Sequence, residues 1–488
     1  MSNIILDWFE AHKNIIVESA LFLIILIFFS WSYYFFCTQG TYKFYDVNQG
    51  TYYHQLASAF EKGMLGIPGS GPGADWSFYN GVNYLYFGPL PIVIWLFLKN
   101  GLHINLSFTQ LTLVFSIINL AIFYWLLTLI HKYLFFKKNF YLQKIIFFII
   151  YGLGSLYFLS ARYLVYETAI IFGSTFMMIS FLFFFAHFNT KGKLIVNDII
   201  LLFFSGIALV LSFFSRVNLI LALLPFIFFI LYKEYSKKNS NILEYTFYKS
   251  WFRLTFFLIP ILIGIIIYSY YNFARFDNPF EFGTKYSAQQ SLEDRFRLTN
   301  HENISINYFI LNNIQLIGLM PKISLTLPFI NYVKPGWLIG EFPKLLNVEW
   351  TSSIFFSSPL LLTIIYVPFL ILKKFKKKQI ITNIFLISST FASVSIYALF
   401  FMGYARRYYQ DYYFLLTLLG FIGFSFIWQD YIGKSKQVIK IIFIIGLFCI
   451  ISWTYLLAVN LNCQLAFKND YVRCLNIYNK PDTFVPLN

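Results

Sequence analysis

The sequence predicts an all-α polytopic membrane protein, and composition and patterning both support this. The chain of 488 residues is 58% hydrophobic and only 12% charged. A water-soluble core cannot hold that much apolar surface. The apolar residues fall in runs of about 17 to 25, the length of helix that crosses about 30 Å of hydrocarbon. A net charge of +16 would suggest a nucleic-acid partner in a soluble protein, but here it is better explained by topology, and no nucleic acid is expected.

The first apolar run, 15–36, is longer than the core of a secretory signal and has no small-residue cleavage site before Cys37. We expect it to remain as an N-terminal anchor. The later runs raise the total to about 11 transmembrane helices. They centre on 107–130, 143–160, 168–188, 198–214, 217–232, 254–272, 353–372, 380–402, 412–428 and 438–458.

Basic clusters set the orientation. With a cytoplasmic N-terminus, HKYLFFKK (131–138), KEYSKK (233–238), KKFKKK (373–378) and GKSK (433–436) all lie on the cytoplasmic side. This distribution follows the positive-inside rule and places the C-terminus outside.

The predicted organisation has six parts. They are an anchor (1–36), a first extracytoplasmic loop (37–106), a transmembrane bundle (107–272), a second extracytoplasmic segment (273–352), a C-terminal bundle (353–458) and an extracytoplasmic tail (459–488). In the tail, Cys463 and Cys474 can form a structural disulfide in an oxidising compartment.

The first loop is expected to carry interfacial helices. Residues 51–65 have apolar side chains at helical spacing, with Gly63 as the stop. The stretch GADWSFYNGVNYLYFGPLPIVI (73–94) then leads into apolar residues that end at Lys99, too soon to span. With Pro89 and Pro91 breaking the chain, we expect this part to lie along the membrane surface.

Charged residues gather at the predicted outer ends of the helices. They are Asp46, Asp75, Arg162, Glu167, Arg216, Arg275, Arg406, Arg407 and Asp411. Most, taken singly, fit interfacial anchors or solvated loop residues. Charges at membrane depth cost about 2.5–3.5 kcal/mol each and tend to face a cavity or one another. Together they therefore predict an arginine-lined anion pocket.

Such a pocket suits a phosphate whose tail remains in lipid. A nearby carboxylate can take a proton from an attacking hydroxyl, while the positive groups stabilise the departing phosphate. These are the requirements for sugar transfer from a lipid-phosphate carrier.

Several segments resemble the GT-C superfamily of integral-membrane glycosyltransferases, in its family-39-like branch. The group includes protein O-mannosyltransferases and lipid A aminoarabinose transferases. The segments are DVNQGTYYHQLASAFEKG, ADWSFYNGVNYLYFGPLP, ARYLVYETAI, NFARFDNPFEFG and RRYYQD. The resemblance implies a GT-C-like bundle in a bacterial inner membrane, a polyprenyl-phosphate sugar donor, inversion at the anomeric carbon and no soluble cofactor. The acceptor stays open among lipid A, a polysaccharide, a wall polymer and a protein.

By position the resemblance assigns the catalytic carboxylate to Asp46. The usual second acid is absent, because Val47 and Asn48 follow, so Asp75 competes for the role of base. The missing acid also disfavours a metal-dependent mode, although a divalent cation stays open.

The other expected roles belong to substrate binding. Arg275 and Arg407 would hold donor phosphate beside Arg406 and Asp411, and Arg162 and Glu167 would order the pocket or touch sugar. Tyr84 and Tyr86 would anchor the interfacial helix or stack on sugar, with anchoring favoured.

Two other functions remain open. A flippase or transporter of a lipid-linked saccharide would have polar groups near the midplane or broken helices in repeated halves, and neither is visible. A catalytically inactive GT-C-like scaffold would retain the fold without the chemistry.

Overall fold

A computed structural model of the chain describes most of the predicted bundle. The described residues are 2–38, 42, 44, 52–69, 76–135, 141–156, 165–189, 195–235, 243–286, 318, 320–323, 330–331, 353–368, 385–386, 389, 410–432 and 435–466. Within them, six helices are long and apolar enough to cross a membrane: Asn14–Cys37, Phe108–Leu134, Tyr166–His187, Trp251–Phe276, Tyr413–Ile432 and Gln437–Val459. The chain is an all-α polytopic membrane protein, as predicted.

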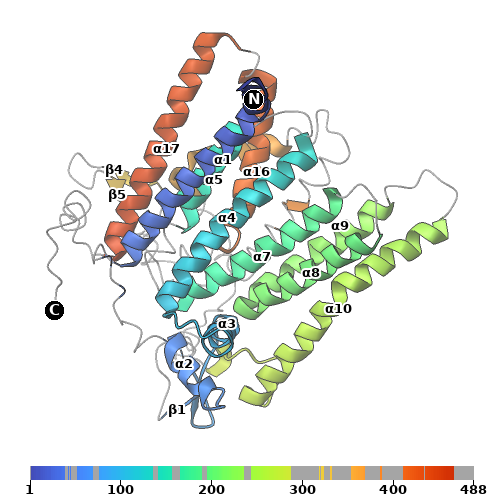
Figure 1. Cartoon of the computed structure of the whole chain (residues 1–488). Helices are drawn as coiled ribbons and strands as arrows, with labels where there is room; N and C mark the ends of the chain where they lie inside the picture. The colour runs from blue at the N-terminus through green and yellow to red at the C-terminus, as the bar shows by residue number, and fades with distance from the viewer. Residues whose placement is uncertain are drawn as a thin grey trace.

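The helices are named in Figure 1. The long ones are α1 (Ser2–Cys37), α4 (Phe108–Phe135), α7 (Val165–Asn189), α8 (Ile195–Ser215), α10 (Leu243–Phe276), α16 (Tyr413–Ile427) and α17 (Gln437–Ala466). Shorter ones are α2 (Tyr52–Glu61), α3 (Leu90–Leu96), α5 (Tyr141–Tyr151), α9 (Leu223–Tyr235) and α13 (Ile354–Ser357). Short 3-10 or π helices are η2 (Phe97–Gly101), η3 (Gly152–Leu156), η4 (Val217–Ala222), η5 (Thr284–Tyr286), η7 (Pro359–Ile365) and η9 (Trp428–Ile432).

Buried hydroxyl and amide groups tie the central helices together. Asn119 of α4 donates to Ser174 Oγ and Thr175 Oγ1 of α7, at 3.0 and 2.9 Å. Ser180 of α7 and Ser205 of α8 exchange hydrogen bonds with each other's carbonyl oxygens. Side-chain bonds of this kind supplement van der Waals packing between membrane helices. They fix the α4, α7 and α8 layer that supports the site.

The segment after α1 folds as a small assembly against one end of the bundle. Figure 1 shows α2, α3 and β1 together beside the start of α4 and the end of α10. Tyr53 of α2 stacks on Phe108 of α4 at 5.7 Å, and the Trp95 indole of α3 donates to the Leu106 carbonyl at 2.7 Å. α3 exposes Val93 on its other side. The helix from 90 to 101 is too short to span.

The stretch from 76 to 85 forms a β-hairpin, which the sequence analysis did not predict. β1 (Ile67–Pro68), β2 (Trp76–Tyr79) and β3 (Val82–Leu85) pair antiparallel in the order β1-β3-β2. Asn80 and Gly81 join β2 to β3 with φ of 48° and 79°. Asn-Gly is the preferred pair for this two-residue turn, so the signal was present in the sequence.

The region near 353–372 also differs from its prediction as one long helix. Its described part consists of α13 and η7, separated at Ser358, which has φ −141° and ψ 77°. Pro359 follows directly, and a residue before proline is disfavoured in the helical region. A second short pairing, β4 (Lys322–Ile323) with β5 (Ile330–Asn331), lies in the second predicted outer segment.

Candidate functional site

Charged side chains from four helices lie at the end of the bundle that the β2–β3 hairpin covers. The chain carries Arg216 between α8 and η4, Arg275 in the last turn of α10, Glu167 in the first turn of α7, and Asp411 just before α16. These positions agree with the predicted gathering of charge at helix ends. Their individual contacts decide what each side chain can do.

Arg216 and Asp411 form a two-point ion pair. Arg216 Nε lies 3.2 Å from Asp411 Oδ1, and Arg216 Nη2 lies 2.6 Å from Oδ2. The Asn218 amide also donates to Oδ2 at 3.3 Å. Asp411 is 1% exposed. Because both carboxylate oxygens accept hydrogen bonds, Asp411 is held as a structural anion at the start of α16.

The backbone around Arg216 explains why the side chain points to Asp411. Helix α8 ends at Ser215, and Arg216 is extended with φ −138° and ψ 105°. The Ser215 hydroxyl donates to the Ala169 carbonyl of α7 at 2.7 Å. The stem of Arg216 packs on Gly173, where an added Cβ would lie 2.9 Å from Arg216 Cγ. A glycine in α7 therefore makes room for the arginine.

Arg275 is almost fully buried and connects α10 to β3. Its Nη1 donates to the Leu85 carbonyl at 2.8 Å, and its Nη2 donates to Asn272 Oδ1 at 2.6 Å. The guanidinium lies 3.9 Å from the Tyr271 ring and 4.8 Å from the Phe276 ring. Arg275 is 2% exposed. In this arrangement it fastens the hairpin to the bundle.

Glu167 and two tyrosines occupy the junction between the hairpin and α7. Glu167 is fully buried. Beside it in sequence, the Tyr166 hydroxyl lies 3.2 Å from the Tyr86 hydroxyl. Tyr86 also contacts the Phe87 ring at 4.3 Å. These contacts place Tyr86 against α7, and its anchoring role stays a prediction.

Tyr84 is half-buried. Its ring packs edge-on against Phe276 at 5.2 Å. Loss of hydration raises the pKa of the Tyr84 hydroxyl, and Arg275 opposes that rise while Asp277 adds to it. Tyr84 therefore senses the charge of the same guanidinium that holds β3.

Tyr53 is a buried residue near the site to which the sequence analysis gave no role. It is buried in α2, and its hydroxyl faces the Gly88 carbonyl at 3.5 Å. Burial raises the pKa of this hydroxyl, and the charge of Arg216 acts in the opposite direction.

Asn218 and Asn272 also went without a predicted role. Each lies close to an arginine in sequence and makes a hydrogen bond that orients a charged partner. The sequence signal that could have identified them is an asparagine two or three residues from an arginine at the membrane edge.

The remaining predicted site residues lie outside the described residues. They are Asp46, Asp75, Arg162, Arg406 and Arg407. The predicted Cys463–Cys474 bridge is also outside, because Cys474 is not among the described residues. Within the described part, no group of three or more His, Cys, Asp and Glu side chains forms a candidate metal site.

No protein-family model and no curated protein matches the chain. Two solved structures resemble its helix arrangement. One is the apo form of the Archaeoglobus fulgidus oligosaccharyltransferase, at 11% identity over 93% of this chain and 55% of that chain. The other is the oligosaccharyltransferase AglB from Archaeoglobus fulgidus in complex with an inhibitory peptide and a dolichol-phosphate, at 12% identity over 94% of this chain and 56% of that chain.

The TM-score is 0.49 for both. This chain spans little more than half the length of either protein. Similarity at this level carries no conclusion about activity, so the functional proposal rests on the residues of this chain.

Proposed function

We propose that the chain is a membrane glycosyltransferase that moves a sugar from a polyprenyl-phosphate carrier to an extracytoplasmic acceptor. The observation that carries the proposal is the buried Arg216–Asp411 pair, together with the buried charges of Arg275 and Glu167 on helices that pack against α8. Buried charges at such a depth are costly and are characteristic of functional sites. The site would face the outer side of a bacterial inner membrane.

In this proposal the described residues position the reacting groups. The Arg216–Asp411 pair fixes the chain just after Arg406 and Arg407, and these two arginines would contact the donor phosphate. Guanidinium groups match phosphate oxygens with paired hydrogen bonds and stabilise negative charge as it develops. Arg275 would contribute positive charge from behind the hairpin, with Arg162 and Glu167 ordering the sugar.

The chemical step is a substitution at the anomeric carbon. An acceptor hydroxyl oxygen forms the new bond to that carbon as the bond to the phosphate oxygen breaks. The hydroxyl proton passes to Asp46, or alternatively to Asp75, and polyprenyl phosphate leaves with the bonding electrons. Attack opposite the leaving group inverts the configuration. The acceptor would be a lipid, a glycan or a protein.

The test is transfer of labelled sugar from a panel of polyprenyl-phosphate donors to membrane acceptors. Asp46→Asn and Asp75→Asn are compared with the native chain at matched expression, and Asp430→Asn is the control because Asp430 is an exposed acid in η9, at the other end of α16 from Asp411. Loss of about 10²-fold or more in one of the two variants identifies the base. Unchanged transfer in both removes both carboxylates from the mechanism.

Donor movement across vesicles by the native chain, without any transfer, would favour the flippase. Neither transfer nor movement would favour the inactive scaffold.

A further inference from the structure

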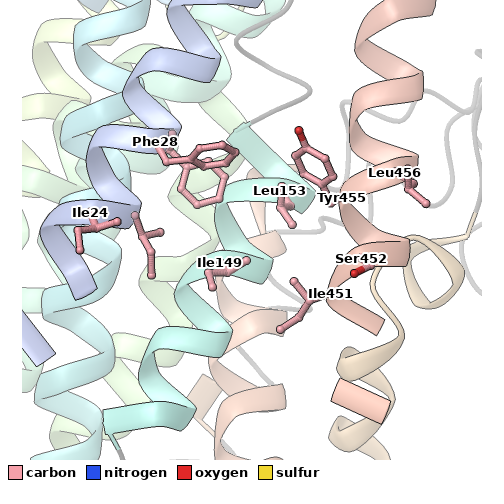
Figure 2. A pocket seen from close by; sticks show the side chains of 10 residues that line it. Ile24, Phe28, Ile149, Leu153, Ile451, Ser452, Tyr455 and Leu456 are labelled. Atoms are coloured by element: carbon pink, nitrogen blue, oxygen red, sulfur yellow. The ribbon is translucent and has the colours of Figure 1, made fainter. Parts of the chain in front are cut away.

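An apolar crevice opens between three membrane helices. It lies between α1, α5 with η3, and α17, and its volume is about 570 Å³. Figure 2 shows Ile24 and Phe28 on one wall, Ile149 and Leu153 at the back, and Tyr455 on the opposite wall. This volume is within the range of small-ligand sites, about 300–1,000 Å³.

The walls of the crevice are fixed by contacts on both sides of it. Towards the N-terminal end of α1, Glu18 pairs with Lys144 of α5. Towards its C-terminal end, the Tyr33 hydroxyl donates to the Gly152 carbonyl at 3.1 Å. α17 is held on a different neighbour, because the Trp453 indole donates to the Phe356 carbonyl of α13 at 2.9 Å. The space is therefore built into the packing.

The crevice lies at membrane depth and suits hydrocarbon. Its lining residues from α1 fall within the span Asn14–Cys37, and those from α17 fall within Gln437–Val459. Among the described residues, no charged side chain lines it, and the polar groups that do are Ser452 and the Tyr455 hydroxyl. Water requires two to four polar partners to occupy a buried space. A flexible apolar chain fits this lining.

The inner wall of the crevice continues directly into the charged site. Leu153 lines the crevice, and the next residue, Gly154, accepts a hydrogen bond from the Gln410 side chain at 3.5 Å. Gln410 precedes Asp411, the partner of Arg216. Gly154 packs so closely that an added Cβ would lie 1.8 Å from the Tyr413 hydroxyl oxygen. One turn of chain thus separates an apolar space from a buried ion pair.

From this continuity we propose that the crevice receives the isoprenoid chain of the donor. The proposal rests on the function proposed above. The phosphate would lie on the Asp411 side of η3, with the chain running along α1 and α17 beside Phe28 and Tyr455. Those two rings contact each other at 6.4 Å between centroids and form part of the crevice wall.

The experiment uses the purified full chain in nanodiscs and polyprenyl phosphate carrying a photoreactive group on its chain. After irradiation, labelled peptides are identified by mass spectrometry. Labelling of the segments around Ile24, Ile149 and Ser452, competed by unlabelled polyprenyl phosphate and not by phospholipid, supports the proposal. Labelling confined to other helices overturns it. Equal labelling by a photoreactive phospholipid also overturns it, because the occupant would then be bulk lipid.

Matched variants distinguish loss of binding in the crevice from a general effect of adding a tryptophan to the helix. Ile24→Trp and Ser452→Trp fill the crevice and should weaken this labelling about tenfold. Ile27→Trp and Phe448→Trp add the same ring on the same helices at strongly exposed positions, and should leave labelling unchanged. Equal labelling in the filled and control variants contradicts the proposal, and labelling of the native chain remains a test if a filled variant does not fold.

The readout needs no sugar, so it is independent of the activity. Crevice labelling without transfer would contradict only the glycosyltransferase proposal. Transfer with labelling elsewhere would contradict only the crevice assignment.

Discussion

Arg216 and Asp411 are 195 residues apart in the chain and meet in a buried two-point ion pair. The pair joins the end of α8 to the start of α16, and Asn218 adds a third hydrogen bond. It is the strongest described link between the two halves of the candidate site.

Removing one partner of this pair should be strongly destabilising. Asp411→Asn leaves the guanidinium of Arg216 without its counter-charge, which costs about 3–5 kcal/mol for a buried pair. The measurement is thermal unfolding in detergent at matched concentration. The double variant Arg216→Gln with Asp411→Asn should lose less than Asp411→Asn alone.

The exposed pair of Lys99 and Glu61 provides the control. Lys99→Gln should cost no more than about 1 kcal/mol, since solvent screens exposed pairs. Equal losses in Asp411→Asn and Lys99→Gln would show that the buried pair has no special importance.

Gly88→Ala should displace the first outer segment. A Cβ at Gly88 would lie 1.9 Å from the Phe214 carbonyl oxygen, and backbone cannot move aside as a side-chain tip can. We expect a loss of about 1–3 kcal/mol from overpacking. Gly446→Ala is the comparison, because nothing lies within 4 Å of its added Cβ. Thermal unfolding of both variants tests the difference, and similar midpoints would contradict the close contact.

Arg275→Lys should loosen the hairpin without changing net charge. Lysine cannot reproduce the two-sided hydrogen bonding to Leu85 and Asn272. Losing a charge-assisted bond costs about 1.5–3 kcal/mol, which corresponds to about ten- to hundredfold faster amide exchange in β3. Hydrogen exchange read by mass spectrometry measures this. Lys285→Arg, at an exposed position, should leave β3 unchanged. Unaltered exchange in Arg275→Lys would contradict the fastening role.

Tyr79 should titrate abnormally at alkaline pH. Its hydroxyl donates to Asp277 Oδ2 at 3.1 Å, and this bond is the main cause that raises the pKa of Tyr79, followed by loss of hydration. A raised pKa in the folded state stabilises the protein below the ordinary tyrosine pKa of about 10, and this contribution disappears as pH rises through the folded value. Asp277→Asn should therefore lower the pKa of Tyr79.

Tyrosine absorbance is titrated in the native chain and in Asp277→Asn, each with and without Tyr79→Phe. Subtracting the curve of the Tyr79→Phe protein leaves the titration of Tyr79 alone. Glu281→Gln in the same loop serves as the control and should leave the pKa of Tyr79 unchanged. A Tyr79 curve that does not move in Asp277→Asn would contradict the hydrogen bond as the cause.

The sequence predicted the elements whose pattern is local. The helix expected over 51–65 is α2, and Gly63 follows it with φ 73°. The apolar residues after Pro89 form a short helix with one exposed face. Both follow from spacing and turn chemistry within about fifteen residues.

The pairings within the site could not be predicted, because they join distant segments. The sequence placed Arg216 and Asp411 at helix ends but offered no way to choose between Asp411 and the other acids as the partner. Arg275 was expected to hold phosphate, and that role stays a prediction. Its contacts with Leu85 and Asn272 depend on a hairpin fold that hydropathy does not reveal.

The short stretch from Ser212 to Asn218 connects α7, the first outer segment and the chain before α16. Its serines hold α7, its Phe214 carbonyl supports Gly88 of the outer segment, and its Arg216 and Asn218 hold Asp411. A displacement of the outer cover must therefore pull on the same backbone that carries the ion pair. We therefore expect displacement of the outer segment and release of α16 to be coupled.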